Sequence, residues 1–187
     1  MKPSESAMNT PDAVLTFWFV THNEADWFGA KPEFDAELAR YFTATHAWVA
    51  AGNATAWRVS PDGRLAEIIV LDQFSRQLYR KRPEAFASAP LALMLARELV
   101  ASGGDLALEP RRRMFVYLPF MHSEDLAVHE EAAPLFAAYG SEQFSDFERR
   151  HIETLQRFGR YPYRNEALGR VSTPEELDYI KSGNGMF

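Results

Sequence analysis

The chain contains 187 residues, of which 47% are hydrophobic and 25% are charged, and its formal net charge is -6. This composition is typical of a soluble globular protein with a full hydrophobic core. Because the sequence has no cysteine, disulfides, thiolate metal sites and a cysteine nucleophile are excluded. The negative charge argues against nucleic acid as a partner, since no excess of basic residues attracts phosphates.

The start of the chain carries no targeting signal that we can identify. Residues 1–10 are polar, without the apolar run of a secretory signal. The longest early apolar run, residues 14–20, is far too short to cross a bilayer. We therefore expect a cytoplasmic protein with no membrane partner. Its expected organisation is a flexible tail over residues 1–10 and a single helical domain over residues 11–187.

Capping residues, prolines and glycines divide the chain into helices. Serine or threonine followed by proline is typical of a helix start, and glycine after an apolar segment is typical of a helix end. These signals predict helices that begin at Thr10, Pro32, Ser60, Pro83, Arg111, Ser123, Ser141 and Thr173. Four of them are expected over residues 32–51, 111–118, 123–139 and 141–158, and the capping box at Thr173 is the strongest local signal. No alternating pattern is long enough to predict a strand, so the expected fold class is all-α.

The most informative helix covers residues 65–80, LAEIIVLDQFSRQLYR, and is apolar on nearly every side. Such a helix must be covered all round, which predicts a place at the centre of the domain. Three polar side chains interrupt it: Asp72, Gln73 and Arg76. A charge buried there without a partner costs several kcal/mol, so we expect each charge to have a partner or a functional role.

Charge is distributed unevenly over the last third of the chain. Residues 121–148 contain seven acidic residues and no lysine or arginine, whereas residues 149–170 contain six arginines and two glutamates. Arginine is well suited to bidentate, partly buried ion pairs. One interpretation is that the two segments fold against each other and neutralise their charges. The other is that a surplus of positive charge lines a cleft.

The block of residues 157–165 carries the arginines that are most suggestive of binding. Arg157, Arg160 and Arg164 are spaced by three and four residues, with Asn165 directly after them. They can converge on a carboxylate or phosphate and hold it by bidentate hydrogen bonds. They can equally serve as structural counter-ions for Asp72 and Glu124.

Histidines and a glutamate raise the question of catalysis. His122 and Glu124 are candidates for general acid–base chemistry, although Ser123 can equally cap the next helix, and Glu124 and Asp125 in its first turn can complement the helix dipole. His129 and His151 lie on apolar helix faces, where histidine is usually a hydrogen-bonded core residue.

A metal centre or an established catalytic motif is not expected. His122 and His129 are two turns apart, about 10 Å along a helix, which is too far to share one ion. No nucleophile-elbow, Walker or dinucleotide-binding glycine pattern is present. We expect no cofactor.

Four motifs together resemble one family. They are LDQFSRQLYR at 71–80, RMFVYLPFMHSED at 113–125, RFGRYPYRN at 157–165 and LGRVSTPEE at 168–176. They resemble bacterial domain-of-unknown-function family 924, and the resemblance covers about residues 12–187. It implies a compact bundle of about seven to eight helices, packed as antiparallel hairpins similar to tetratricopeptide repeats. It implies no activity. His129 and Tyr163 depart from the family pattern, which has glutamine and histidine there.

Three functions remain open on the sequence alone. The leading hypothesis is a protein that binds a small anion or a peptide carboxylate in a polar cleft. The second is an enzyme acting on an anionic small molecule, with His122 or Glu124 as general acid–base. The third is an interaction scaffold in which the charges only hold helices together. The candidate ligand-binding residues are Asp72, Gln73, Arg76, His122, Glu124, Arg157, Arg160, Arg164 and Asn165.

Overall fold

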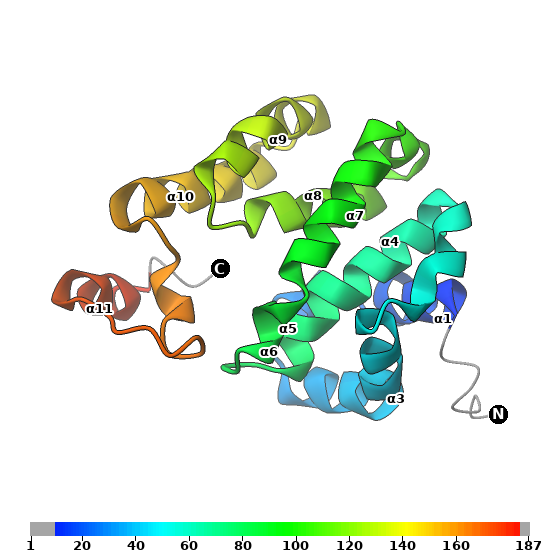
Figure 1. The fold of residues 1–187 in the computed structure, drawn as a ribbon, viewed down its shortest axis with the longest axis horizontal. Helices are drawn as coiled ribbons and strands as arrows, with labels where there is room; N and C mark the ends of the chain where they lie inside the picture. Colours follow the sequence, from blue (N-terminus) through cyan, green and yellow to red (C-terminus); the bar gives the residue numbers. More distant parts are fainter. Residues whose placement is uncertain (1–9, 184–187) are drawn as a thin grey trace. The chain divides into compact units, whose positions relative to one another are not determined.

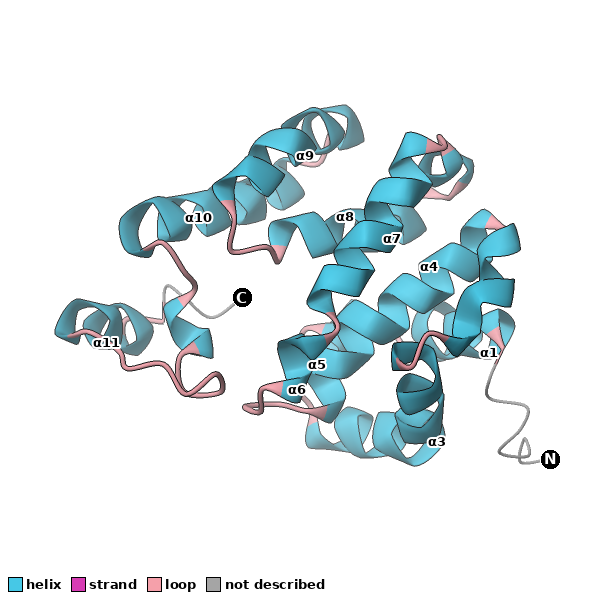
Figure 2. Cartoon of the chain, in the orientation of Figure 1, coloured by secondary structure: helices cyan, strands magenta, loops and turns pink. Residues whose placement is uncertain are grey.

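The computed structural model describes residues 10–183, and every regular element in this range is helical (Figure 1). Figure 2 shows only helices and connecting loops over the described chain. The all-α prediction is therefore confirmed. Packing as hairpins similar to tetratricopeptide repeats stays a prediction. The expected flexible tail, 1–10, falls almost entirely outside the described residues.

The chain divides into two compact units. The N-terminal unit comprises residues 1–80 and 84–116, and the C-terminal unit comprises residues 81–83 and 117–187. The expectation of a single domain over residues 11–187 stays a prediction.

The N-terminal unit is built from short and long helical segments in chain order. They are α1 (Pro11–Leu15), η2 (Thr16–Thr21), α2 (Glu24–Trp27), α3 (Pro32–Ala50), η3 (Asn53–Val59), α4 (Pro61–Ile69), η4 (Val70–Phe74), α5 (Ser75–Leu78), α6 (Glu84–Ala87), α7 (Ala89–Ala101), η5 (Gly104–Ala107) and the first part of α8 (Pro110–Met121). The segments η2 and η4 are π-helical, and η3 and η5 are 3₁₀ turns.

The predicted central helix is continuous through α4, η4 and α5, and it is covered on all sides. Leu65, Ile68 and Phe74 have no exposed surface. Helices α1 and α7 pack on α4, and α3 and α7 pack on η4. Complete burial of such side chains contributes about 2 kcal/mol each relative to exposure. This helix therefore forms the core of the N-terminal unit, as its composition predicts.

Aromatic side chains from η2, α2 and α3 complete this core. The rings of Trp18 and Trp27 stack with centroids 5.4 Å apart, and Trp27 Nε1 donates to the carbonyl of Trp18 at 2.9 Å. Phe42 and Phe74 rings are 5.1 Å apart. Ring pairs of this kind stabilise a core beyond their buried area.

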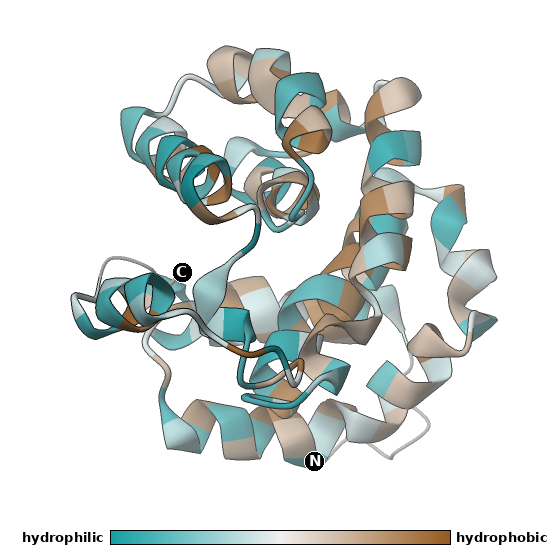
Figure 3. Cartoon of the chain, turned by 60° about the vertical axis from the view of Figure 1, so that its left-hand side comes forward, coloured by the Kyte–Doolittle hydropathy of each residue, from teal (hydrophilic) through white to brown (hydrophobic). Residues whose placement is uncertain are grey.

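The C-terminal unit contains the end of α8, then α9 (Leu126–Tyr139), α10 (Glu142–Phe158), η6 (Pro162–Arg164) and α11 (Pro174–Lys181). Helices α9 and α10 pack against each other, joined by a turn at Gly140. The backbone of Gly140 has φ 74°, a left-handed conformation that side chains disfavour, so the predicted glycine stop is physically required. Figure 3 shows hydrophilic and hydrophobic residues alternating along the helices, as expected for elements with one covered face.

Several predicted bounds are wrong. The helix predicted to start at Pro83 is divided into α6 and α7, because Ser88 and Pro90 interrupt it. Helix α8 continues to Met121 through Pro119, which was expected to end it. Helix α9 begins three residues later than predicted, since Asp125 rather than Ser123 caps it, accepting from Ala127 N at 3.0 Å.

No helix among the described residues is long and apolar enough to cross a membrane.

The capping box at Thr173 gives a test of the local sequence signals. Its hydroxyl accepts from Glu176 N at 3.2 Å, and the Glu176 carboxylate accepts from Thr173 N at 2.8 Å. We expect Thr173→Ala to lower the free energy of unfolding by about 1 kcal/mol, because the first turn of α11 loses its capping hydrogen bond. Urea denaturation measures this.

Thr43→Ala is the matched control. The Thr43 hydroxyl is exposed and bonds only to the carbonyl of Ala39 in its own helix, at 2.7 Å. Alanine has the higher helix propensity, so this change should not destabilise the protein. Equal losses in both variants would contradict a specific role for the cap.

Candidate functional site

The polar residues of the central helix lie in and just after the π-helical turn η4. Asp72 is almost fully buried, and one of its oxygens accepts from Gln73 Nε2 at 2.7 Å. The other lies 3.5 Å from an Arg76 Nη2, one turn further on. The π turn contains one residue more than an α turn, and such turns are frequent at functional sites. Here it places two polar side chains inside an apolar helix.

Arg76 is held less completely than its neighbours. Its guanidinium lies over the ring of Phe86, with the central carbon 5.4 Å from the ring centroid. The 3.5 Å contact to Asp72 is long for an ion pair. Its Nε is buried and makes no hydrogen bond among the described residues. An unmatched buried donor of this kind indicates a missing acceptor.

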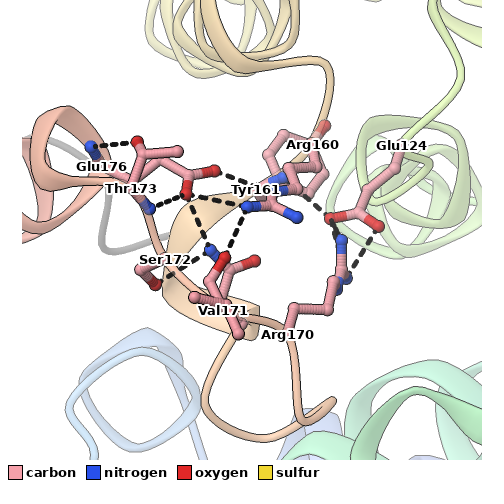
Figure 4. Close-up of polar contacts among 9 residues, drawn as sticks. Glu124, Arg160, Tyr161, Arg170, Val171, Ser172, Thr173 and Glu176 are labelled. Atoms are coloured by element: carbon pink, nitrogen blue, oxygen red, sulfur yellow. Dashed lines mark hydrogen bonds and ion pairs between the residues drawn. The ribbon is translucent and has the colours of Figure 1, made fainter.

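Arg157 and Arg160 in the C-terminal unit both pair with acids of α11. Arg157 donates from Nε and Nη2 to one oxygen of Glu175 at 2.9 and 2.7 Å, on the surface. Arg160 binds Glu176 with both oxygens engaged, at 2.7 and 2.8 Å, and also donates to the carbonyl of Val171 (Figure 4). The acids were expected to be Asp72 and Glu124. They come instead from beyond residue 170.

Glu124 forms its ion pair with Arg170. Arg170 donates from both Nη atoms, at 2.9 to 3.2 Å, and Tyr161 N donates to the same carboxylate at 2.7 Å (Figure 4). This contact joins the loop before α9 to the loop after η6. The prediction that the acidic segment 121–148 neutralises arginines of 149–170 is thus correct for this pair.

Arg164, Asn165 and His122 also have defined surroundings. Arg164 is buried, donates to the carbonyl of His122 at 2.9 Å and lies over the Tyr161 ring at 4.5 Å. Asn165 donates to Ser172 Oγ at 3.0 Å and to Glu176 at 3.3 Å. The His122 ring is half-buried, with its centroid 6.4 Å from that of His151. The structure therefore places the side chains of Arg160 and Asn165 around the carboxylate of Glu176.

His129 is a buried, hydrogen-bonded core residue, as its apolar helix face predicts, and it is the centre of a buried network. His129 Nδ1 lies 2.6 Å from Glu148, and Nε2 lies 3.0 Å from the carbonyl of Ser123 and 3.2 Å from the hydroxyl of Tyr161. Burial opposes a charge on His129, but the hydrogen bond to Glu148 and its negative charge outweigh it and raise the pKa above the usual value. Both ring nitrogens then donate, so the ring joins α9, α10 and the loop at Ser123.

Two further histidines are buried as neutral groups. Burial lowers the pKa of His151 to about 3, against the opposing effect of its Nδ1 hydrogen bond to the carbonyl of Phe147 at 2.7 Å. Burial also lowers the pKa of His46, whose Nε2 lies 2.7 Å from Ser75 Oγ. Ser75 is fully buried and also donates to the carbonyl of Leu71 at 2.7 Å. This serine–histidine contact is therefore inaccessible to a substrate.

Within residues 10–183, no three acidic or histidine side chains converge closely enough to hold a metal ion. The absence of a metal from the function stays a prediction.

These features define an all-α protein whose last helix is tied to the segments before it by ion pairs with Arg157 and Arg160. Residues 14–184 match the family described as "Bacterial protein of unknown function (DUF924)", and the chain belongs to this family, as its motifs predict. A solved structure of a protein of unknown function from Agrobacterium tumefaciens is similar, with 32% identity and a TM-score of 0.87. The match covers 96% of this chain and 100% of that chain. No curated protein matches.

The arginine pairs predict different effects on stability. Arg160→Ala removes the partner of Glu176, whose carboxylate is almost fully buried, and leaves that charge without its main counter-ion. We expect a clear fall in the melting temperature, measured by differential scanning calorimetry. Arg157→Ala is the matched control, because both members of its pair are more than half exposed and such pairs contribute little. Equal melting temperatures for the two variants would contradict a structural role for Arg160.

Acid should destabilise the protein through His151 and Glu176. The lowered pKa of His151 means that stability is complete above its ordinary value of 6.5 and is lost as the pH falls towards about 3. The hydrogen bonds from Arg160 hold the pKa of Glu176 at about 2, so its contribution is present above 4.5 and is lost as the pH falls towards about 2. His129 acts oppositely, since stability from a raised pKa is lost as the pH rises through it.

The test is urea unfolding of the protein and of His151→Asn at a series of pH values. The asparagine amide can replace the donor to Phe147 but cannot bind a proton. We expect the variant to lose less stability than the parent between about pH 6.5 and about pH 3. Parallel curves for the two proteins would contradict the assignment of this acid effect to His151.

Proposed function

We propose that this protein binds a small anion or a peptide carboxylate, and that Arg76 holds it. The supporting observation is the buried Arg76 Nε, which makes no hydrogen bond among the described residues. A carboxylate or phosphate oxygen supplies the acceptor that this donor lacks. In this proposal Asp72 fixes the guanidinium of Arg76 from one side through the contact at 3.5 Å. Gln73 in turn donates to Asp72 and fixes its carboxylate.

The local electrostatics support a carboxylate-sized ligand rather than a large polyanion. Asp72 already offsets part of the charge on Arg76, so one anionic group completes the balance. The net charge of -6 repels extended polyanions from the chain as a whole. The ring of Phe86 lies against the guanidinium and limits its motion, which reduces the entropy lost on binding.

The remaining candidates have other roles in this proposal. Arg157 and Arg160 act as structural counter-ions of Glu175 and Glu176, because their donors are already engaged. The supporting geometry for an enzyme is weaker, since the Glu124 carboxylate accepts from Arg170 and Tyr161 N and is not left to exchange protons with a substrate. Binding through His122, Arg164 or Asn165 and a cytoplasmic location stay predictions.

Isothermal titration calorimetry with acetate, inorganic phosphate and a short peptide with a free carboxyl terminus tests the proposal. We expect at least one of them to bind, and Arg76→Ala to weaken that binding by about tenfold or more, the usual loss for a hydrogen-bonded charge. Arg76→Lys is the matched variant, because it keeps the charge but not the planar donor edge, and it should bind with intermediate affinity.

The outcomes separate binding from folding. Each variant is first compared with the parent by melting temperature in the absence of ligand. Unchanged affinity in a folded Arg76→Ala variant, or no binding of any of the three probes to the parent, would rule out this site.

A further inference from the structure

A second guanidinium, that of Arg111, is mounted on an aromatic platform in the N-terminal unit. Its central carbon lies 4.9 Å from the centroid of the Trp27 ring and 5.9 Å from that of Phe19. Its Nη1 donates to the carbonyl of Phe19 at 3.4 Å. No carboxylate in the described part of the chain lies within ion-pair distance of this exposed side chain. The rings therefore hold a cation that has no acidic counter-ion.

The position of this guanidinium follows from local structure. Phe19 lies in the last turn of the π-helical segment η2, where carbonyl groups lose their partners within the helix. One N–H group of Arg111 donates to such a carbonyl, that of Phe19. Its other N–H groups remain for a ligand, and a guanidinium that lies flat on a ring presents them along its edge.

Two exposed apolar side chains directly follow the platform residues Phe19 and Trp27 in the sequence. Phe28 is 60% exposed, and its ring stands perpendicular to that of Trp27, with centroids 6.2 Å apart. Val20 is 76% exposed and follows Phe19 directly. It also lines a surface hollow of about 400 Å³, together with the Arg112–Asp62 ion pair. The surface thus combines an unmatched cation with exposed apolar groups, which is the composition of a protein-binding patch.

The chemistry of this surface selects one kind of partner. A polyanion needs many basic groups, and here Arg112 is already paired at 2.7 Å, so Arg111 is the cation that is left. A free anion gains little at an exposed arginine. A peptide gains from both parts of the surface, because its acidic side chain meets Arg111 while an apolar neighbour covers Phe28 or Val20.

We propose that the surface formed by Val20, Phe28, Arg111 and Arg112 binds a peptide segment of another protein in which an acidic residue stands beside apolar ones. This site is separate from Arg76 and does not depend on the function proposed for that residue. Its aromatic and arginine content is typical of residues that dominate binding energy at protein interfaces.

The experiment is selection from a library of displayed random peptides on the purified protein, followed by fluorescence anisotropy with the selected peptides. We expect enrichment of sequences with aspartate or glutamate next to apolar residues. Arg111→Ala should weaken their binding about tenfold or more, and replacement of the peptide's acidic residue by its amide should do the same. Phe28→Ser should weaken binding about threefold or more through lost apolar contact.

Arg40→Ala is the matched control. Arg40 is also exposed in the N-terminal unit and lies over a ring, that of Tyr41 at 5.4 Å, but no large exposed apolar side chain flanks it in the sequence. This change removes the same charge and should alter affinity less than about twofold. Equal losses for Arg40→Ala and Arg111→Ala would show a general charge effect and overturn the proposal.

Other outcomes also decide. Selected peptides without acidic residues, or full affinity in a folded Arg111→Ala variant, overturn the proposal. Competition by acetate or phosphate as strong as that by the peptide also overturns the proposal, because the ligand is then a simple anion. Self-association that is lost in Arg111→Ala overturns it as well, because the occupant is then a second copy of this chain. Binding that is lost in Arg76→Ala but kept in Arg111→Ala supports the function proposed for Arg76 and overturns this one.

Discussion

The helix through α4, η4 and α5 must be covered on every side, and the N-terminal unit is arranged to meet this requirement. Helices α1, α3 and α7 pack on it, and the aromatic side chains of η2 and α2 extend the same core. Once such a helix is enclosed, its few polar groups can no longer exchange partners with water. That is why the surroundings of Asp72, Gln73 and Arg76 are so closely defined, and why one unmatched nitrogen there is informative.

The C-terminal unit depends on polar contacts as well as on apolar packing. Ion pairs and a buried histidine link segments that are distant in the sequence. Glu176 receives Arg160, Asn165 and its own cap, and Glu124 receives Arg170 and a backbone amide. Removing one member of such a cluster leaves the others buried without compensation, so these contacts specify the arrangement of loops more than they add to stability.

Local signals in the sequence predicted much of this fold. The caps at Thr10, Ser60, Ser141 and Thr173 each accept a hydrogen bond from the first turn that follows, because capping depends only on neighbours in the chain. Uniform burial of the central helix could also be predicted, since composition decides it. The π turns could not, because a single extra residue per turn leaves no clear trace in the apolar pattern.

The candidate site was harder to predict for the same physical reason. The sequence indicates that Arg157 and Arg160 need acids, but the choice between Glu124 and the acids of α11 depends on how loops close in space. His129 looked like an ordinary core histidine, and its contact with Glu148, which raises its pKa, depends on how the neighbouring helices α9 and α10 pack. The contact between Arg111 and the Trp27 ring joins residues more than eighty positions apart, so no local sequence motif predicts it.

The π turn η4 also constrains how this chain can change. A turn of this kind holds one residue more than regular helix, and an α-helix advances by about 100° per residue. Loss of any single residue from Val70–Phe74 would restore regular hydrogen bonding, yet it would rotate everything after it by about that angle. The buried Ser75 would then leave His46. The number of residues in this helix is therefore fixed, although its overall shape does not show the position at which a deletion would displace this contact.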